Sequence, residues 1–247
     1  MEKMDKELDK KLNEIARVLD ETSGGSFRQL WWKIPRSDLE THLKILDTLE
    51  KLGKSQPGSV RTDKRSILYA FACACLAEQY WKEIRANTGS ARYHEYLHNF
   101  DKYFRKAIEL LENMEYSCER NYRLADVYVM FASCLQDAVY LSDMNRKSDV
   151  YTRRERLEQI EVLYEKGIEV YEDVKKYKDY EIRDKLFEVL WHMAYFQREV
   201  IESIDGYQEW LDKAYKLAKE LDDEGFPCLL GRENKYTWWL QEESHFS

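Results

Sequence analysis

Three segments of the chain share one pattern that is typical of a helix packed closely on another helix. In each segment a Lys precedes a small residue, a bulky residue follows it, and an aliphatic residue stands two positions further on. The segments are YFRKAIELLE at 103–112, LYEKGIEVYE at 163–172 and WLDKAYKLAK at 210–219. A small residue lets two helix backbones approach while its apolar neighbours fill the flanks. The small residues are Ala107, Gly167 and Ala214.

The rest of the chain also favours helices. Apolar residues recur at helical spacing between loop signals such as TSGGS, SQPGS, NTGS and DEGFP. The chain has 247 residues with only three prolines and nine glycines, and no β-hairpin signal occurs in its sequence. We therefore predict an all-α fold. The expected helices are 2–21, 37–53, 62–86, 91–115, 119–143, 152–176, 179–203, 206–222 and 231–243.

Short connections between long helices predict antiparallel neighbours. We expect 62–86 to pair with 91–115, 119–143 with 152–176, and 179–203 with 206–222. The three copies of the pattern are unevenly spaced, which predicts an irregular, curved array of stacked hairpins. We expect one domain over 1–247, with an N-terminal helical cap (1–60), the stacked hairpins (61–222) and a C-terminal capping helix (223–247).

Helix starts are indicated at three places. Ser37 is followed three residues later by Glu40, and Thr152 by Glu155, which is the pattern of a capping box. Asp205 is the expected N-cap before 206–222.

Over 62–222 the chain resembles tetratricopeptide-type proteins. Ala107, Gly167 and Ala214 stand where the second helix of that family carries its small packing residue, and Leu76, Ala77 and Tyr80 match part of its first-helix pattern. This resemblance implies a tetratricopeptide-like array that binds proteins or peptides.

The chain also resembles the 14-3-3 proteins, which have nine antiparallel helices and an acidic composition. KRSILYAFACACLAEQYWKEI (64–84) is similar to their third helix and ENKYTWWL (233–240) to the end of their last one. Their phosphate pocket does not carry over. Phe71 and Glu78 replace its Lys and Arg, and its Arg-Tyr pair falls near Val129 and Met130.

The segment HEYLH at 94–98 is an instance of the zinc-binding pattern His-Glu-x-x-His on a predicted helix. His94 and His98 share a helix face and could ligate Zn²⁺, while Glu95 could activate a bound water. The structural alternative is that both histidines border the apolar stripe of the helix, where they face solvent. We favour the structural reading, with no cofactor, and keep a small zinc-dependent hydrolase as the alternative function.

Basic residues stand near the starts of alternate helices. If these first helices line a concave surface, the basic side chains form a strip that binds carboxylates or phosphates through charge-assisted hydrogen bonds. An ordinary solvated face is the other reading. The residues are Lys64, Arg65, Arg120, Arg123, Arg183 and Lys185.

Two tryptophan pairs are candidates for partner contact: Trp31 with Trp32, and Trp238 with Trp239. Adjacent tryptophans on one helix cannot both face the same core, and exposed Trp is enriched at interaction hot spots. Capping the open ends of the stack is the alternative.

Composition and motifs narrow the function. The net charge of −8 makes nucleic acid an unexpected partner, and the sequence contains no Walker loop, dinucleotide fingerprint or CxxC pair. The absence of a signal or membrane-spanning pattern and the five cysteines, read as reduced core thiols, predict a cytoplasmic location. We expect a non-enzymatic scaffold that binds a protein or peptide, including an acidic or phosphorylated segment. An obligate subunit of a larger complex, or a homodimer, is a further possibility.

Overall fold

The computed structural model describes residues 2–22, 39–55, 62–86, 91–145, 153–175 and 180–225, and the regular structure in these ranges is entirely helical. Eight α-helices occupy the described residues, as the all-α prediction requires. They are α1 (Glu2–Thr22), α2 (Leu39–Ser55), α3 (Thr62–Ala86), α4 (Tyr93–Glu112), α5 (Cys118–Asn145), α6 (Arg153–Val174), α7 (Tyr180–Phe196) and α8 (Ile204–Asp223).

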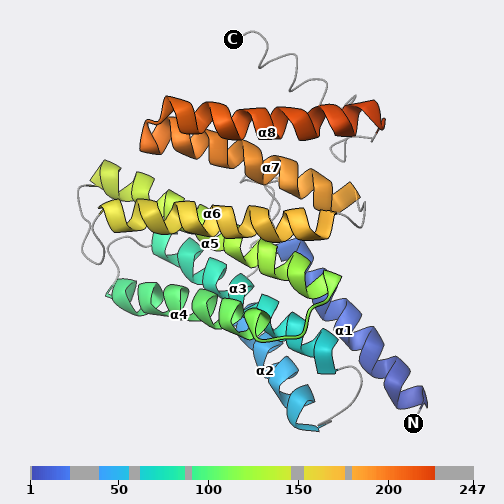
Figure 1. Ribbon diagram of the computed structural model, residues 1–247. Helices are drawn as coiled ribbons and strands as arrows, with labels where there is room; N and C mark the ends of the chain where they lie inside the picture. The colour runs from blue at the N-terminus through green and yellow to red at the C-terminus, as the bar shows by residue number, and fades with distance from the viewer. Residues whose placement is uncertain are drawn as a thin grey trace.

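Consecutive helices pack as adjacent pairs. α3 packs along α4, α5 along α6, and α7 along α8, and these are the three pairs that the short connections predict. Figure 1 shows the three pairs one above another, from α3 and α4 to α7 and α8. Both α1 and α2 pack against α3. The pairing predicted from sequence is therefore confirmed.

The first helix of each pair is buried more completely than the second. In α5, every residue from 123 to 132 is buried, and α5 contacts α3, α4 and α6. By contrast, α4 buries one stripe made of Phe100, Phe104, Ala107 and Leu111. Spacings of three and four residues place these side chains on one helix face, so α4 covers the core from outside.

Aromatic rings join α4 to α3 and α5. The ring of Phe104 stacks on that of Phe131 with centroids 4.7 Å apart, and Phe100 meets both Phe131 and Trp81 edge-on or tilted. Such ring pairs add to the free energy that burial of their apolar surface contributes.

The small residues of the repeated pattern lie where the helices touch. Ala107, Gly167 and Ala214 are all buried, as their pattern predicts. The bulky residue that follows each small residue differs in its exposure from one copy to another. Ile168 is buried, whereas the side chain of Tyr215 is 49% exposed because it lies on the outer side of α8.

The start of α8 differs from the prediction. Ser203, and not Asp205, is the N-cap: its backbone is extended and its hydroxyl accepts a hydrogen bond from the backbone N–H of Gly206 at 3.1 Å. The preceding helix ends in a π-helical turn, Gln197–Ile201, after which Glu202 adopts a left-handed conformation with φ of 60°. This reversal places Ser203, rather than Asp205, at the first unpaired backbone N–H groups of α8.

Several predictions fall outside the described residues. These are the helix 231–243, the caps Ser37 and Thr152, and the pairs Trp31–Trp32 and Trp238–Trp239. None of the helices in the described part of the chain is long and apolar enough to cross a membrane.

Candidate functional site

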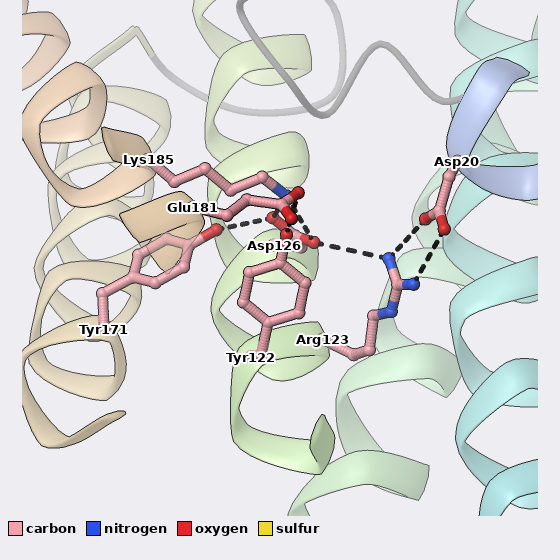
Figure 2. A network of polar contacts seen from close by, with 7 residues as sticks. All are labelled: Asp20, Tyr122, Arg123, Asp126, Tyr171, Glu181 and Lys185. Carbon is pink, nitrogen blue, oxygen red and sulfur yellow. Dashed lines mark hydrogen bonds and ion pairs between the residues drawn. The ribbon is translucent and has the colours of Figure 1, made fainter. Parts of the chain in front are cut away.

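A carboxylate lies in the middle of the buried part of α5. Asp126 is 2% exposed and is surrounded along the helix by apolar side chains. Lys185 of α7 donates to both of its oxygens, at 2.7 and 3.0 Å, and the hydroxyl of Tyr171 on α6 donates to Oδ1 at 2.5 Å (Figure 2). A buried carboxylate is tolerated only when it is paired and hydrogen-bonded, and Asp126 is both.

Arg123 lies one helical turn before Asp126 and faces α1. Its two terminal nitrogens donate to the two carboxylate oxygens of Asp20, at 2.6 and 3.2 Å. Its nearest approach to Asp126 is longer, 3.7 Å from Nη1 to Oδ2. Arg123 therefore forms a bidentate pair with Asp20 and a looser ion pair with Asp126, as Figure 2 shows.

The guanidinium of Arg123 is held in a fixed position. Its central carbon lies 4.3 Å from the ring centroid of Phe71 on α3, and it also approaches the ring of Tyr122. Burial pulls the pKa of Arg123 down, but the hydrogen bonds and charge of Asp20, with the charge of Asp126, hold it above its ordinary value. The side chain is thus a permanent cation at the junction of α1, α3 and α5.

Lys185 is positioned by an aromatic ring as well as by Asp126. Its Nζ lies 4.4 Å from the ring centroid of Tyr122, and the hydroxyl of Tyr122 donates to Oε1 of Glu181 at 3.0 Å. Burial, together with the charges of Asp126 and Glu181, raises the pKa of Tyr122, so its hydroxyl stays protonated. We call Asp20, Tyr122, Arg123, Asp126, Tyr171, Glu181 and Lys185 the charged cluster (Figure 2).

The charged cluster joins five helices, since its members or their partners lie on α1, α3, α5, α6 and α7. Chemically, it offers two cations whose positions are fixed by stacking and hydrogen bonds. Lys185 is neutralised by the buried Asp126, whereas Arg123 is neutralised by Asp20, which lies at the protein surface.

The structure brings together two of the six predicted basic residues, Arg123 and Lys185, around Asp126. The other four have separate partners. Lys64 donates to Asn13 of α1 at 2.8 Å, and Arg65 approaches the backbone oxygen of Leu52 in α2 at 3.4 Å.

Arg120 and Arg183 each bind the end of a helix. Arg120 donates to the backbone oxygens of Leu111 and Glu112, where α4 ends. Arg183 forms a bidentate pair with Glu224, just after α8, at 2.7 and 3.1 Å. Each guanidinium meets groups at a helix C-terminus, where a cation is favoured by the helix dipole.

The zinc pattern lies on the outer surface of α4. His94, Glu95 and His98 are all exposed, and the ring of His94 rests edge-on against that of Tyr93. Within the described ranges, no three His, Cys, Asp or Glu side chains gather closely enough to hold a metal ion.

The buried thiols belong to the core. Cys73, Cys75 and Cys134 are in no disulfide with the described residues, and burial raises the pKa of each, for Cys73 to about 12. A thiol with a raised pKa is a poor nucleophile, as expected for a core cysteine.

Five members of the charged cluster are not among the residues that the sequence singles out: Asp20, Tyr122, Asp126, Tyr171 and Glu181. One signal pointed to Asp126, because a lone acid within the apolar run of α5 requires a buried partner. The other four have no such signal, since an acid or a Tyr is ordinary on an amphipathic helix.

Comparisons with known proteins find no similar family: no protein-family model matches the chain, and neither the curated proteins nor the solved structures contain a significant match.

Proposed function

We propose that this protein is a non-enzymatic helical scaffold that binds a protein or peptide segment, and that its paired helices form an irregular tetratricopeptide-like array. The observation that supports this proposal is the arrangement of α3, α4, α5, α6, α7 and α8 as three consecutive hairpins. Stacked hairpins provide a wide preformed surface, so a partner segment binds with little ordering of the scaffold.

The charged cluster supports the same proposal. Tyr122, Arg123 and Lys185 all lie on first helices of the hairpins, at the side where α1 also packs. Arg and Tyr are enriched among the residues that contribute most to binding at protein interfaces. Fixed cations on this side favour an acidic or phosphorylated segment over an apolar one.

A display selection with the purified chain tests the proposal. Short random peptides are selected against the chain, and the enriched sequences are synthesised with a photo-reactive residue for cross-linking. We expect cross-links on α3, α5 and α7, because these first helices form the proposed binding surface. A helical control protein of the same net charge, selected in parallel, identifies peptides that respond to charge alone. Enrichment no greater than for that control, or cross-links confined to α4, α6 and α8, would contradict the proposal.

A further inference from the structure

Asp20 meets Arg123 through two parallel hydrogen bonds, which is the geometry in which an Arg binds the carboxylate of a partner. We infer that Arg123 binds a carboxylate of an acidic partner peptide, and that Asp20 of α1 occupies this position in the isolated chain. The inference rests on the proposed function and names the chemistry of the partner: a peptide with Asp or Glu side chains. It also names the residue that such a peptide displaces.

Asp20 lies on the solvent side of the pair. Its side chain is 49% exposed, whereas that of Arg123 is 11% exposed. Figure 2 shows the guanidinium between the carboxylates of Asp126 and Asp20, of which Asp126 is buried. An incoming carboxylate can therefore replace Asp20 without any movement of Asp126, Tyr171 or Lys185.

The position of Asp20 in α1 makes its bond to Arg123 exchangeable. Asp20 lies in the last turn of α1, at the negative end of the helix dipole, where the dipole disfavours an acid. Separately, α1 is held on α3 by the buried side chains of Leu12, Ile15 and Leu19. The carboxylate of Asp20 can thus leave Arg123 while α1 stays packed.

The charges around Arg123 favour a carboxylate over a phosphate. Without Asp20, the charged cluster holds two cations, Arg123 and Lys185, and two anions, the buried Asp126 and the exposed Glu181. An incoming carboxylate restores the single negative charge that Asp20 carries beside Arg123. A phosphate dianion at the same place would meet Asp126, whose Oδ2 is 3.7 Å from Nη1 of Arg123, and like charges at short range repel.

The contact of Arg123 with Phe71 prepares the site for carboxylate recognition. A guanidinium whose central carbon is held over a ring, 4.3 Å from its centroid, presents its terminal nitrogens in a fixed position, and their planar fork matches the two oxygens of a carboxylate. Nε of Arg123 is buried and finds no hydrogen-bond partner among the described residues, so the terminal nitrogens carry the recognition.

Fluorescence anisotropy with a labelled oligoglutamate peptide tests the inference. Asp20→Asn removes the internal competitor. Glu209→Gln is its control, because it removes one exposed carboxylate from a pair with Lys213, which has no guanidinium fork, and changes the net charge equally. We expect Asp20→Asn to bind oligoglutamate about tenfold tighter than wild type, since the binding-competent fraction rises. Glu209→Gln should bind like wild type, and an oligoglutamine peptide should bind to neither variant.

Two further variants decide which residue binds. In Asp20→Asn/Arg123→Lys the gain should disappear, because Lys keeps the charge but lacks the fork. Equal gains in Asp20→Asn and Glu209→Gln, or a gain that survives Arg123→Lys, would overturn the inference. Tighter binding of a phosphoserine peptide than of oligoglutamate would overturn the assignment to a carboxylate.

A measurement on the wild-type chain covers the case in which a variant fails to fold. In protein labelled with ¹⁵N-arginine, the Nε–H resonance of Arg123 should shift as oligoglutamate is added. A resonance that does not shift at saturating peptide would refute the site.

Failure of the inference can be told apart from failure of the proposed function. Selected peptides that bind independently of Arg123 would leave the function standing. If Asp20→Asn binds oligoglutamate but the display selection enriches no peptide, the carboxylate site at Arg123 stands and the proposed function fails.

Discussion

Gly167 of α6 lies directly against Val129 of α5. A Cβ atom at Gly167 would be 2.8 Å from Cγ2 of Val129 and 3.5 Å from the backbone oxygen of Ala125. Contacts this short are not sustained between carbon atoms, so the glycine sets how closely the two helices approach. A β-branched, buried valine has little freedom to turn aside.

Replacement of Gly167 by Ala should therefore destabilise the protein. Overpacking of a core costs about 1–3 kcal/mol, whereas the better helix propensity of Ala returns about 1 kcal/mol. We expect a net loss of about 1 kcal/mol in the free energy of unfolding, measured by urea denaturation. The control is Gly167→Ala/Val129→Ala, in which the clash is absent. If Gly167→Ala destabilises the Val129→Ala protein as much as it destabilises wild type, contact with Val129 does not limit the packing.

Replacement of Asp126 by Asn should destabilise the protein strongly. The change leaves the buried Lys185 without its anion, and breaking a buried ion pair costs about 3–5 kcal/mol. The double variant Asp126→Asn/Lys185→Met should lose less than the sum of its single changes, because it contains no unpaired buried amine. The exposed pair of Lys213 with Glu209 is the control, and Lys213→Ala should change stability by less than about 1 kcal/mol. Strictly additive losses would show that Asp126 and Lys185 are not coupled.

Removal of the Ser203 hydroxyl should destabilise α8. Ser203→Ala deletes the acceptor of the Gly206 N–H, and loss of an N-cap costs about 1 kcal/mol. Asp205→Ala is the matched control in the same turn, with a smaller expected loss of about 0.5 kcal/mol from the helix dipole. Thermal unfolding of both variants measures the difference. A larger loss of stability in Asp205→Ala than in Ser203→Ala would instead identify Asp205 as the N-cap, as the sequence predicts.

The protein should lose stability in mild acid through His192. Burial lowers the pKa of His192 from its ordinary value of 6.5 to about 4. As pH falls from about 6.5 to about 4, the unfolded chain binds a proton that the folded chain does not, so the free energy of unfolding falls. The loss from this group amounts to roughly 3 kcal/mol when complete. Urea denaturation measures the free energy of unfolding of wild type and of His192→Gln over this pH range, and the two values should converge at low pH. If the two free energies fall in parallel with pH, His192 is not the cause.

Substitution of the two histidines of the zinc pattern should leave the protein unchanged. His94 and His98 are exposed on α4, and surface substitutions usually alter stability by less than about 0.5 kcal/mol. We expect His94→Ala/His98→Ala to match wild type in melting temperature and in zinc content by elemental analysis. About one zinc per chain in the wild type, lost in the variant, would instead support the hydrolase reading, with Glu95→Gln as the next variant.

Within the part of the chain that the structure describes, the sequence by itself determined the helices and their pairing. Helical periodicity is a local signal, and connections of a few residues leave antiparallel neighbours as the natural arrangement, so α3 with α4, α5 with α6 and α7 with α8 could be predicted. The burial of Gly167 followed from the repeated pattern for the same reason. Helix ends were less certain, because the π-helical turn before Ser203 depends on packing and has no signature in the local sequence.

The tertiary structure alone decided the charged cluster. Arg123 meets Asp20, which is 103 residues away in the chain, and Asp126 meets Lys185, 59 residues away. The apolar run of α5 marks Asp126 as a buried acid that needs a partner, but no spacing rule relates such distant positions, so nothing in the local sequence identifies Lys185 as that partner or Asp20 as the partner of Arg123. They become partners only when packing removes water from around them, because an isolated charge in the core is far less stable than a paired one.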